Sequence, residues 1–277
     1  MKYIAALVTI TRPLNVVIAA IAVVIGGITA LGLPDNWGPV LWAVLSASLI
    51  TAGGNTLNDV TDIEVDRVNK PHRPLPGGLI SVRTAKWWAI VLMTGGVALA
   101  WLLPVACRII VLAAAVVIVA YDLWGKAWSL TGNIVVSLVS GTAFIFGSLA
   151  VDHGLWGLIP GVMAFFFHFG REIIKDLEDL DADGTAGLKT WPLLAGDRVA
   201  RRTAQAILVV LVLILALPNI FGWLGMWYLF VVIPGVAVPV LAVIVRLSRE
   251  QTPQVYGRLQ TILKWDMLLG LAAVLVG

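Results

Sequence analysis

Long apolar stretches, separated by short polar or turn-forming segments, occupy most of this chain. About 20 apolar residues of helix cross roughly 30 Å of hydrocarbon, so stretches of this kind are typical of membrane spans. Nine such stretches lie near residues 14–33, 38–58, 84–104, 108–122, 131–150, 155–175, 198–217, 222–246 and 260–277. The pattern predicts an all-α, polytopic membrane bundle of nine transmembrane helices that forms one domain over residues 1–277.

Turn-forming residues mark several ends of these predicted helices. Residues 32–36 follow the first helix, residues 152–154 separate the fifth from the sixth, and residues 218–219 end the seventh. Glycine, proline, asparagine and aspartate are common at such breaks. Pro234 and Pro239 lie inside the eighth stretch and predict a kink there, because proline removes a backbone hydrogen-bond donor.

The composition excludes an ordinary soluble enzyme. Of the 277 residues, 60% are hydrophobic and only 13% are charged, whereas a soluble domain has about 25% charged residues. The apolar N-terminus is interrupted at Arg12 and Pro13 and has no small-residue cleavage site, so we interpret it as leading into a first membrane helix and not as a signal peptide. The single cysteine, Cys107, excludes an internal disulfide. We expect the lipid bilayer as surroundings and no nucleic-acid partner.

Basic residues are unevenly distributed among the loops. The loops after the first, fifth and seventh spans contain no Lys or Arg, and the loop after the third contains only Arg108. The other Lys and Arg residues lie near the N-terminus or near the loops after the second, fourth, sixth and eighth spans. Because basic residues favour the cytoplasmic side, the sequence predicts a multi-pass protein of the cell membrane whose N-terminus is cytoplasmic and whose C-terminus is not.

Two stripes of acidic and amide side chains follow the second and sixth spans. Both have the spacing i, i+4, i+7, i+11, which forms one continuous stripe on a helix. The members are Asn55, Asp59, Asp62 and Asp66 in the first stripe, and Glu172, Asp176, Asp179 and Asp183 in the second. Their repetition predicts a pseudo-symmetric bundle in which the two stripes face each other across a central cavity on the cytoplasmic side.

The chemistry of these stripes indicates a site for Mg²⁺ and phosphate. Neighbouring carboxylates repel each other unless a cation joins them, and hard oxygen ligands suit Mg²⁺. Lys and Arg follow each stripe and suit phosphate oxygens. At the mouth of an apolar bundle, this combination fits a molecule with a diphosphate head and a long hydrocarbon tail. An ordinary solvated loop is the alternative. A calcium site of the EF-hand type is not indicated, because its loop pattern is absent from both stripes.

These motifs resemble those of the UbiA-type prenyltransferase superfamily of intramembrane enzymes. The pattern N-D-x-x-D-x-x-x-D matches residues 58–66, and D-x-x-x-D matches residues 179–183, with Asp176 one turn earlier. The resemblance covers essentially the whole chain. Within the superfamily, residues 69–78 and 171–179 most resemble archaeal digeranylgeranylglyceryl phosphate synthases, although His72 stands where asparagine is expected.

The resemblance implies a reaction and a set of functional residues. It implies Mg²⁺-dependent transfer of a prenyl group, expected to be geranylgeranyl, from a polyprenyl diphosphate to the hydroxyl of geranylgeranylglyceryl phosphate in archaeal-type ether lipid synthesis. The residues expected to bind the metal and to be catalytic are Asp59, Asp62, Asp66, Asp176, Asp179 and Asp183. The residues expected to bind substrate are Asn15, Asn55, Asn58, Arg67, Lys70, Arg73, Tyr121, Lys126 and Lys189.

The sequence is also compatible with several alternatives. Prenylation of an aromatic acceptor such as 4-hydroxybenzoate would use the same acidic motifs. A secondary transporter and a non-catalytic lipid-binding scaffold are alternatives from other classes. Asn15 could face the cavity or could be an ordinary polar residue at the start of a span. We interpret His168 as a residue that forms a hydrogen bond between helices. The basic residues of 67–73, with Lys189, Arg198, Arg201 and Arg202, exceed what one diphosphate requires, which suits an anionic acceptor or simply sets topology.

Overall fold

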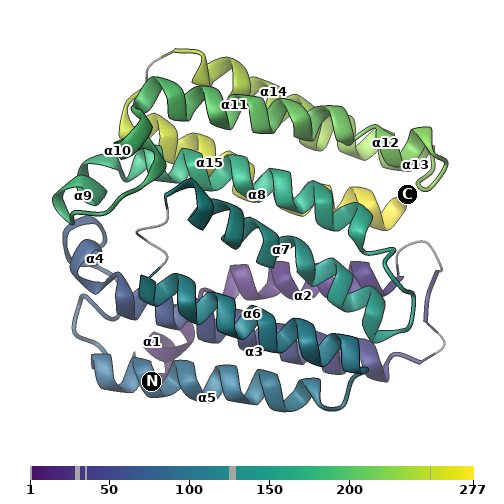
Figure 1. Ribbon diagram of the computed structural model, residues 1–277, viewed down its shortest axis with the longest axis horizontal. Coiled ribbons are helices and arrows are strands. Elements are labelled where there is room, and N and C mark those ends of the chain that lie inside the picture. The colour runs from purple at the N-terminus through teal and green to yellow at the C-terminus, as the bar shows by residue number, and fades with distance from the viewer. Residues whose placement is uncertain (1, 29–31, 35, 125–128, 250) are drawn as a thin grey trace.

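In the computed structural model, which describes residues 2–28, 32–34, 36–124, 129–249 and 251–277, every regular element is a helix (Figure 1). The helices of the first half are α1 (Lys2–Ile10), α2 (Pro13–Ile28), α3 (Gly38–Thr61), α4 (Ile63–Asn69), α5 (Val82–Ala100), α6 (Val105–Trp124) and α7 (Leu130–Ala150). Those that follow are α8 (Leu158–Glu178), α9 (Leu180–Thr185), α10 (Trp191–Ala195), α11 (Asp197–Ile214), α12 (Leu217–Ile220), α13 (Met226–Val232), the π-helix η2 (Ile233–Ala237), α14 (Val238–Leu247) and α15 (Pro253–Val276).

The predicted membrane bundle is confirmed, and each predicted span coincides with a helix or a broken helix. Among the described residues, six helices are long and apolar enough to cross a membrane: α3, α6, α7, α11 with α12, α13 to α14, and α15. A seventh span results if α1 and α2, which are bent by 49°, are taken together. The remaining two predicted spans correspond to α5 and α8, which do not pass the same test of length and composition.

Proline and arginine shape two of these helices as the sequence indicates. Arg12 lies between α1 and α2 with a positive φ of 52°, and Pro13 is the first residue of α2. The predicted interruption at these residues is therefore present. The irregularity predicted at Pro234 and Pro239 takes the form of the π-helix η2, which separates α13 from α14. A π-helical turn is a known way to accommodate a break in the regular hydrogen-bond ladder.

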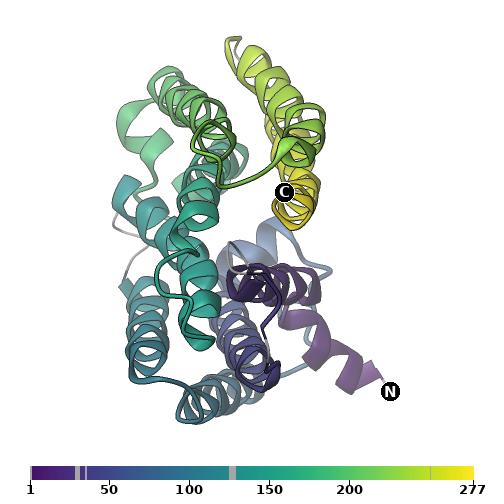
Figure 2. The ribbon, with the colours of Figure 1, turned by 90° about the vertical axis from the view of Figure 1, so that its right-hand side faces the viewer.

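Apolar side chains face both outward and inward, as expected of a protein surrounded by lipid. On α6 the large side chains of Ile109, Leu112 and Val116 are exposed, and only 17% of its most apolar window is buried. Buried residues form one main cluster among α8, α11 and α13 to α15, and another mainly among α3, α5, α6 and α7. Figure 2 shows these two halves at opposite ends of the molecule.

Glycines allow the central helices to approach each other closely. A Cβ atom added to Gly141 on α7 would lie 2.6 Å from the carbonyl oxygen of Gly161 on α8, so no side chain fits between the two backbones. α2 also packs closely on α7. This close contact places α2, α7 and α8 around the middle of the molecule, where they line the cavity described below.

Candidate active site

Both acidic stripes lie at a helix break of the same geometry. α3 ends at Thr61 and α4 begins at Ile63, and Asp62 between them has φ −91° and ψ 5°. α8 ends at Glu178 and α9 begins at Leu180, and Asp179 between them has φ −89° and ψ 7°. Each stripe therefore continues across a helix break, because its third member leaves helical geometry. The expected pseudo-symmetry is supported by these matching breaks.

The two breaks meet at one end of the molecule. Figure 1 shows α4, α9 and α10 together at the left-hand end, next to the ends of α3 and α8. α4 is in contact with α9. The stripes therefore face a common region at the mouth of the bundle, as the sequence predicts.

Two arginines hold the carboxylates of the first stripe. Asp59 and Asp66 are each 3% exposed. The Arg12 guanidinium donates a hydrogen bond to Asp59 Oδ1 and another, of 2.9 Å, to Asn58 Oδ1. The Arg73 guanidinium donates to Asp66 Oδ2 and lies 3.4 Å from Asp59 Oδ1. The charges of these buried carboxylates are thus compensated by cations from two separate loops.

The second stripe is held by a different set of partners. Asn133, near the start of α7, donates from Nδ2 to Asp176 Oδ2 at 2.8 Å, and Asp183 is buried. The side chain of Glu172 does not take part in the site at the Asp179 break. Its two oxygens accept from Arg171 Nη1 at 3.1 Å and Lys175 Nζ at 3.3 Å, which makes Glu172 part of an ion-pair cluster on α8.

The donor chemistry of the stripes fits Mg²⁺, although the carboxylates are spread out. Within the described residues, no three His, Cys, Asp or Glu side chains are close enough together to ligate one ion. All candidate donors are oxygens, and three of these carboxylates, Asp59, Asp66 and Asp183, are buried at the mouth. Mg²⁺ prefers oxygen ligands and commonly takes only one or two carboxylates, with waters and phosphates completing its shell.

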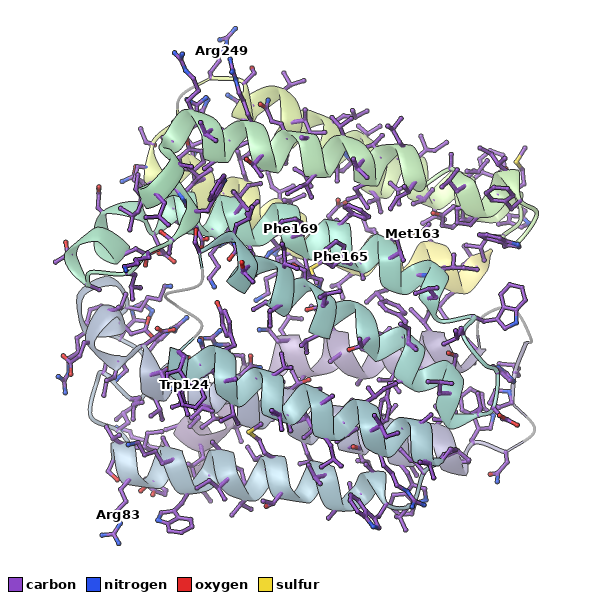
Figure 3. The ribbon with its side chains drawn as sticks, viewed as in Figure 1. Arg83, Trp124, Met163, Phe165, Phe169 and Arg249 are labelled. Carbon is purple, nitrogen blue, oxygen red and sulfur yellow. The ribbon has the colours of Figure 1, made fainter. Side chains whose placement is uncertain are left out.

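A cavity of about 350 Å³ extends from the mouth into the bundle. Its polar end is lined by side chains from several helices, and its inner end by apolar ones such as Phe144, Met163 and Leu215. The polar lining residues are Arg12, Asn15, Thr51, Asn55, Asn58, Tyr121, Asp122, Ser140, His168, Arg171, Glu172, Lys175, Tyr228 and Lys264. Figure 3 shows Met163 and Phe165 along α8 in the middle of the molecule. The cavity can accommodate part of an amphiphile with a charged head and an apolar chain.

The structure sorts the predicted substrate-binding residues into three groups. Four of them, Asn15, Asn55, Asn58 and Tyr121, line the cavity. Arg73 joins the first stripe, and Lys70 is half-buried at the end of α4.

The others lie elsewhere. Arg67 is exposed and bound to Glu64 at 2.7 Å, Lys189 is exposed, and Lys126 lies outside the described residues. His168 lines the cavity, whereas its sequence suggested a helix-packing role.

Several residues of the site were not predicted. Arg12, Asn133, Arg171, Lys175 and Lys264 all contact a motif residue or line the cavity. A usable signal was the presence of single cations inside otherwise apolar stretches, since such residues are costly in a membrane and usually functional. Conversely, Arg201 binds Asp197 at 2.6 Å and the Leu247 carbonyl oxygen at 3.2 Å, so it ties α11 to α14 and does not reach a substrate.

A helical membrane bundle with acidic motifs at the mouth of an amphiphilic cavity defines an intramembrane enzyme that acts on a lipid-like diphosphate. The sequence profile of the UbiA prenyltransferase family matches residues 19–264. The chain belongs to this family.

Relatives and solved structures agree with this assignment. The chain is 36% identical, over 96% of both chains, to the digeranylgeranylglyceryl phosphate synthase of Methanopyrus kandleri. It is 37% identical to that of Halobacterium salinarum, over 98% of this chain and 96% of the relative. A solved structure described as a digeranylgeranylglyceryl phosphate synthase in membranes is 28% identical and has a TM-score of 0.77, covering 100% of this chain and 99% of the other.

The fold is also shared with a more distant structure. A UbiA homologue from Archaeoglobus fulgidus, solved with DMAPP and Mg²⁺, has a TM-score of 0.71 at 23% identity over 100% of both chains.

Proposed function

We propose that this protein transfers a geranylgeranyl group from its diphosphate to the hydroxyl of geranylgeranylglyceryl phosphate, forming the second ether bond of an archaeal-type lipid. The observation that carries the proposal is the cavity, which joins an apolar interior to a polar mouth where two acidic motifs meet. The names of the relatives at 36% and 37% identity support this acceptor. The Mg²⁺ and DMAPP bound by the Archaeoglobus fulgidus homologue support a metal and a prenyl diphosphate.

The acidic residues are proposed to hold Mg²⁺ against the diphosphate. Asp59, Asp62 and Asp66 would form one ligand set, and Asp176, Asp179 and Asp183 the other. When bound, Mg²⁺ neutralises negative charge on the diphosphate and makes it a better leaving group. Arg12 and Arg73 bind carboxylates of the first stripe in this structure, which supports a role for both cations in binding the phosphate oxygens.

The chain itself would bind, orient and protect the reacting groups. As the allylic C–O bond breaks, positive charge develops on the prenyl carbon, and the acceptor hydroxyl oxygen bonds to that carbon and releases its proton. Water would compete with the acceptor, and the apolar lining from α2, α6 and α7 keeps it away. Asn55 and Asn58, both on the cavity wall, would orient polar groups of the substrates.

The membrane arrangement is proposed as nine passes in a single domain. α5 lies against α3, and α8 lies against α7, so both run beside helices that meet the criterion for a span. α8 fails that criterion because its last turns carry the charged residues of the site. With the basic loops cytoplasmic, the acidic motifs and the mouth of the cavity face the cytoplasm.

Product analysis tests the proposed acceptor. Purified protein, Mg²⁺ and geranylgeranyl diphosphate are incubated with geranylgeranylglyceryl phosphate or 4-hydroxybenzoate, and products are identified by mass spectrometry. We expect an ether product, with a higher kcat/KM for the glyceryl phosphate than for the hydroxybenzoate. The reverse order would assign the protein to the aromatic branch of the family. Diphosphate binding without turnover of any acceptor would favour the scaffold alternative.

A further inference from the structure

Cations gather on one wall of the cavity, around Glu172, the innermost member of the second stripe. Arg171 and Lys175 lie one turn apart on α8, and Lys264 lies on the neighbouring helix α15. Glu172 is the only carboxylate that lines this wall among the described residues, and it binds Arg171 and Lys175. Positive charge therefore exceeds negative charge on this wall.

The position of Arg171 is fixed by α15. Its Nη2 donates to Gln260 Oε1 at 2.7 Å, and its Nε donates to the Gln260 carbonyl oxygen at 3.3 Å. Its side chain is 14% exposed, and Nη1 is held by Glu172. The guanidinium is thus oriented before any ligand arrives, which reduces the entropic cost of binding.

Lys264 lies one helical turn beyond Gln260 on the same face of α15 and also lines the cavity. It makes no hydrogen bond or ion pair with any part of the chain that the structure describes. An ammonium group inside a membrane helix bundle is costly unless an anion compensates it, so Lys264 indicates an anion that the protein does not itself supply.

The Arg171 end of this wall lies deeper in the bundle than the proposed diphosphate site. Arg171 precedes Asp176 by five residues on the same helix, which places it roughly 7.5 Å deeper along the helix axis. One turn further inward along the cavity lie His168 and apolar residues, among them Phe167 and Met267. An anion bound here would lie just below the diphosphate, with room for an alkyl chain beyond it.

We infer that Arg171 and Lys264 form the subsite for the anionic headgroup of the acceptor, a phosphate monoester attached to an alkylated glycerol. The inference rests on the proposed function and names the second substrate's binding site. In it, the phosphate accepts hydrogen bonds from both cations while Glu172 and Gln260 keep Arg171 in place. The short glycerol backbone then brings the acceptor hydroxyl toward the prenyl carbon at the mouth. The basic residues of α11 are not needed, because Arg198 and Arg202 are exposed and the buried Arg201 is occupied by Asp197.

A pair of acceptors tests the subsite. Initial rates are measured for the wild type, Lys264→Met and Lys264→Arg, with geranylgeranylglyceryl phosphate and with geranylgeranylglycerol, which lacks the phosphate. We expect Lys264→Met to raise KM for the phosphorylated acceptor about tenfold, since a hydrogen bond to a charged group is lost. KM for the donor diphosphate and for geranylgeranylglycerol should not change, and Lys264→Arg should restore most of the loss.

Matched variants keep the result interpretable. Arg83→Met removes an exposed cation at the outer edge of the molecule, where Figure 3 shows it, and should behave as the wild type. Arg171→Gln should reproduce the effect of Lys264→Met on the same acceptor. An unchanged KM in Lys264→Met, or an equal rise for both acceptors, would overturn the subsite. A wild type that prefers 4-hydroxybenzoate would overturn the proposed function instead, and Lys264→Met would then show whether the wall binds that carboxylate.

Discussion

At the scale of single residues, Asp62 and Asp179 are the most informative carboxylates, because each lies at a helix break with nearly the same dihedral angles. If they are Mg²⁺ ligands, Asp62→Ala and Asp179→Ala should each lower turnover by about 10²-fold or more, equivalent to a few kcal/mol of transition-state stabilisation. Initial rates at saturating Mg²⁺ measure this, and size-exclusion profiles check folding.

The chain offers matched controls for these two carboxylates. Glu64 and Asp181 are exposed acidic residues on α4 and α9 that lie outside the stripes. Glu64→Ala and Asp181→Ala should keep near-normal rates. If Asp62→Ala or Asp179→Ala behaves like these controls, the corresponding stripe is not the ligand set.

Asn133 provides a second test at this scale, since its side chain orients Asp176 through a hydrogen bond of 2.8 Å. Groups that orient metal ligands commonly contribute 10- to 100-fold to metal affinity. We therefore expect Asn133→Ala to raise the Mg²⁺ concentration for half-maximal turnover about tenfold, with a smaller effect at saturation. A Mg²⁺ titration measures this, and Thr131→Ala, an exposed change on the same helix, is the control. If the Mg²⁺ concentration for half-maximal turnover does not change, Asp176 does not need the hydrogen bond from Asn133.

At the scale of helices, the contact between α7 and α8 depends on small residues. A Cβ at Gly141 would lie 2.6 Å from a backbone oxygen that cannot move aside. Overpacking of this kind typically costs about 1–3 kcal/mol, so Gly141→Ala should lower the Tm of the purified protein in detergent. Gly95→Ala on α5 is the control, because its Cβ would make an ordinary 3.4 Å contact with Leu49. Equal Tm values for the two variants would contradict the close packing.

The positions of the helices could be predicted well from the sequence, because the hydropathy of a stretch depends only on its own residues. The stretch near 131–150 became α7 almost residue for residue. The same reasoning placed both acidic stripes at span ends and at one end of the molecule. It missed the breaks at Asp62 and Asp179, since nothing local in their sequences forbids a helix and the break places α4 and α9 in contact.

Contacts between distant residues were the part that the sequence could not supply. Arg12 reaches Asp59 across 47 positions, and Arg171 reaches Gln260 across 89. Arg201 illustrates the converse. It stood in a basic cluster that suited a substrate, but Asp197, one turn earlier on its own helix, binds it. Charge in a loop indicates a possible phosphate site, and only the tertiary structure shows which charges are already compensated.

At the scale of the whole molecule, the arrangement of the helices predicts the topology of the chain in the membrane. Figure 1 shows α4, α9 and α10 at one end of the molecule and the C-terminus at the other. The long helices run back and forth between these ends, and the nine passes proposed above would place the two termini on opposite sides of the membrane. Basic residues concentrate at the end with the acidic motifs, which predicts that this end is cytoplasmic.

A reporter fused after Gly277 should therefore read as extracytoplasmic, and a reporter inserted at Gly187, in the exposed turn after α9, should read as cytoplasmic. Both fusions need to retain prenyl transfer, so that only correctly folded protein is scored. The reason is the charge bias: Arg108 is the only Lys or Arg assigned to the outer loops, and reversing the protein would carry most of the others across the membrane. Two cytoplasmic signals from active fusions would mean an even number of passes between Gly187 and Gly277, so that one of the three candidate spans there, α11 with α12, α13 to α14 or α15, does not cross the membrane. Two exchanged signals would keep an odd number of passes after Gly187 but place the cavity mouth, and with it the supply of diphosphate, on the outer side.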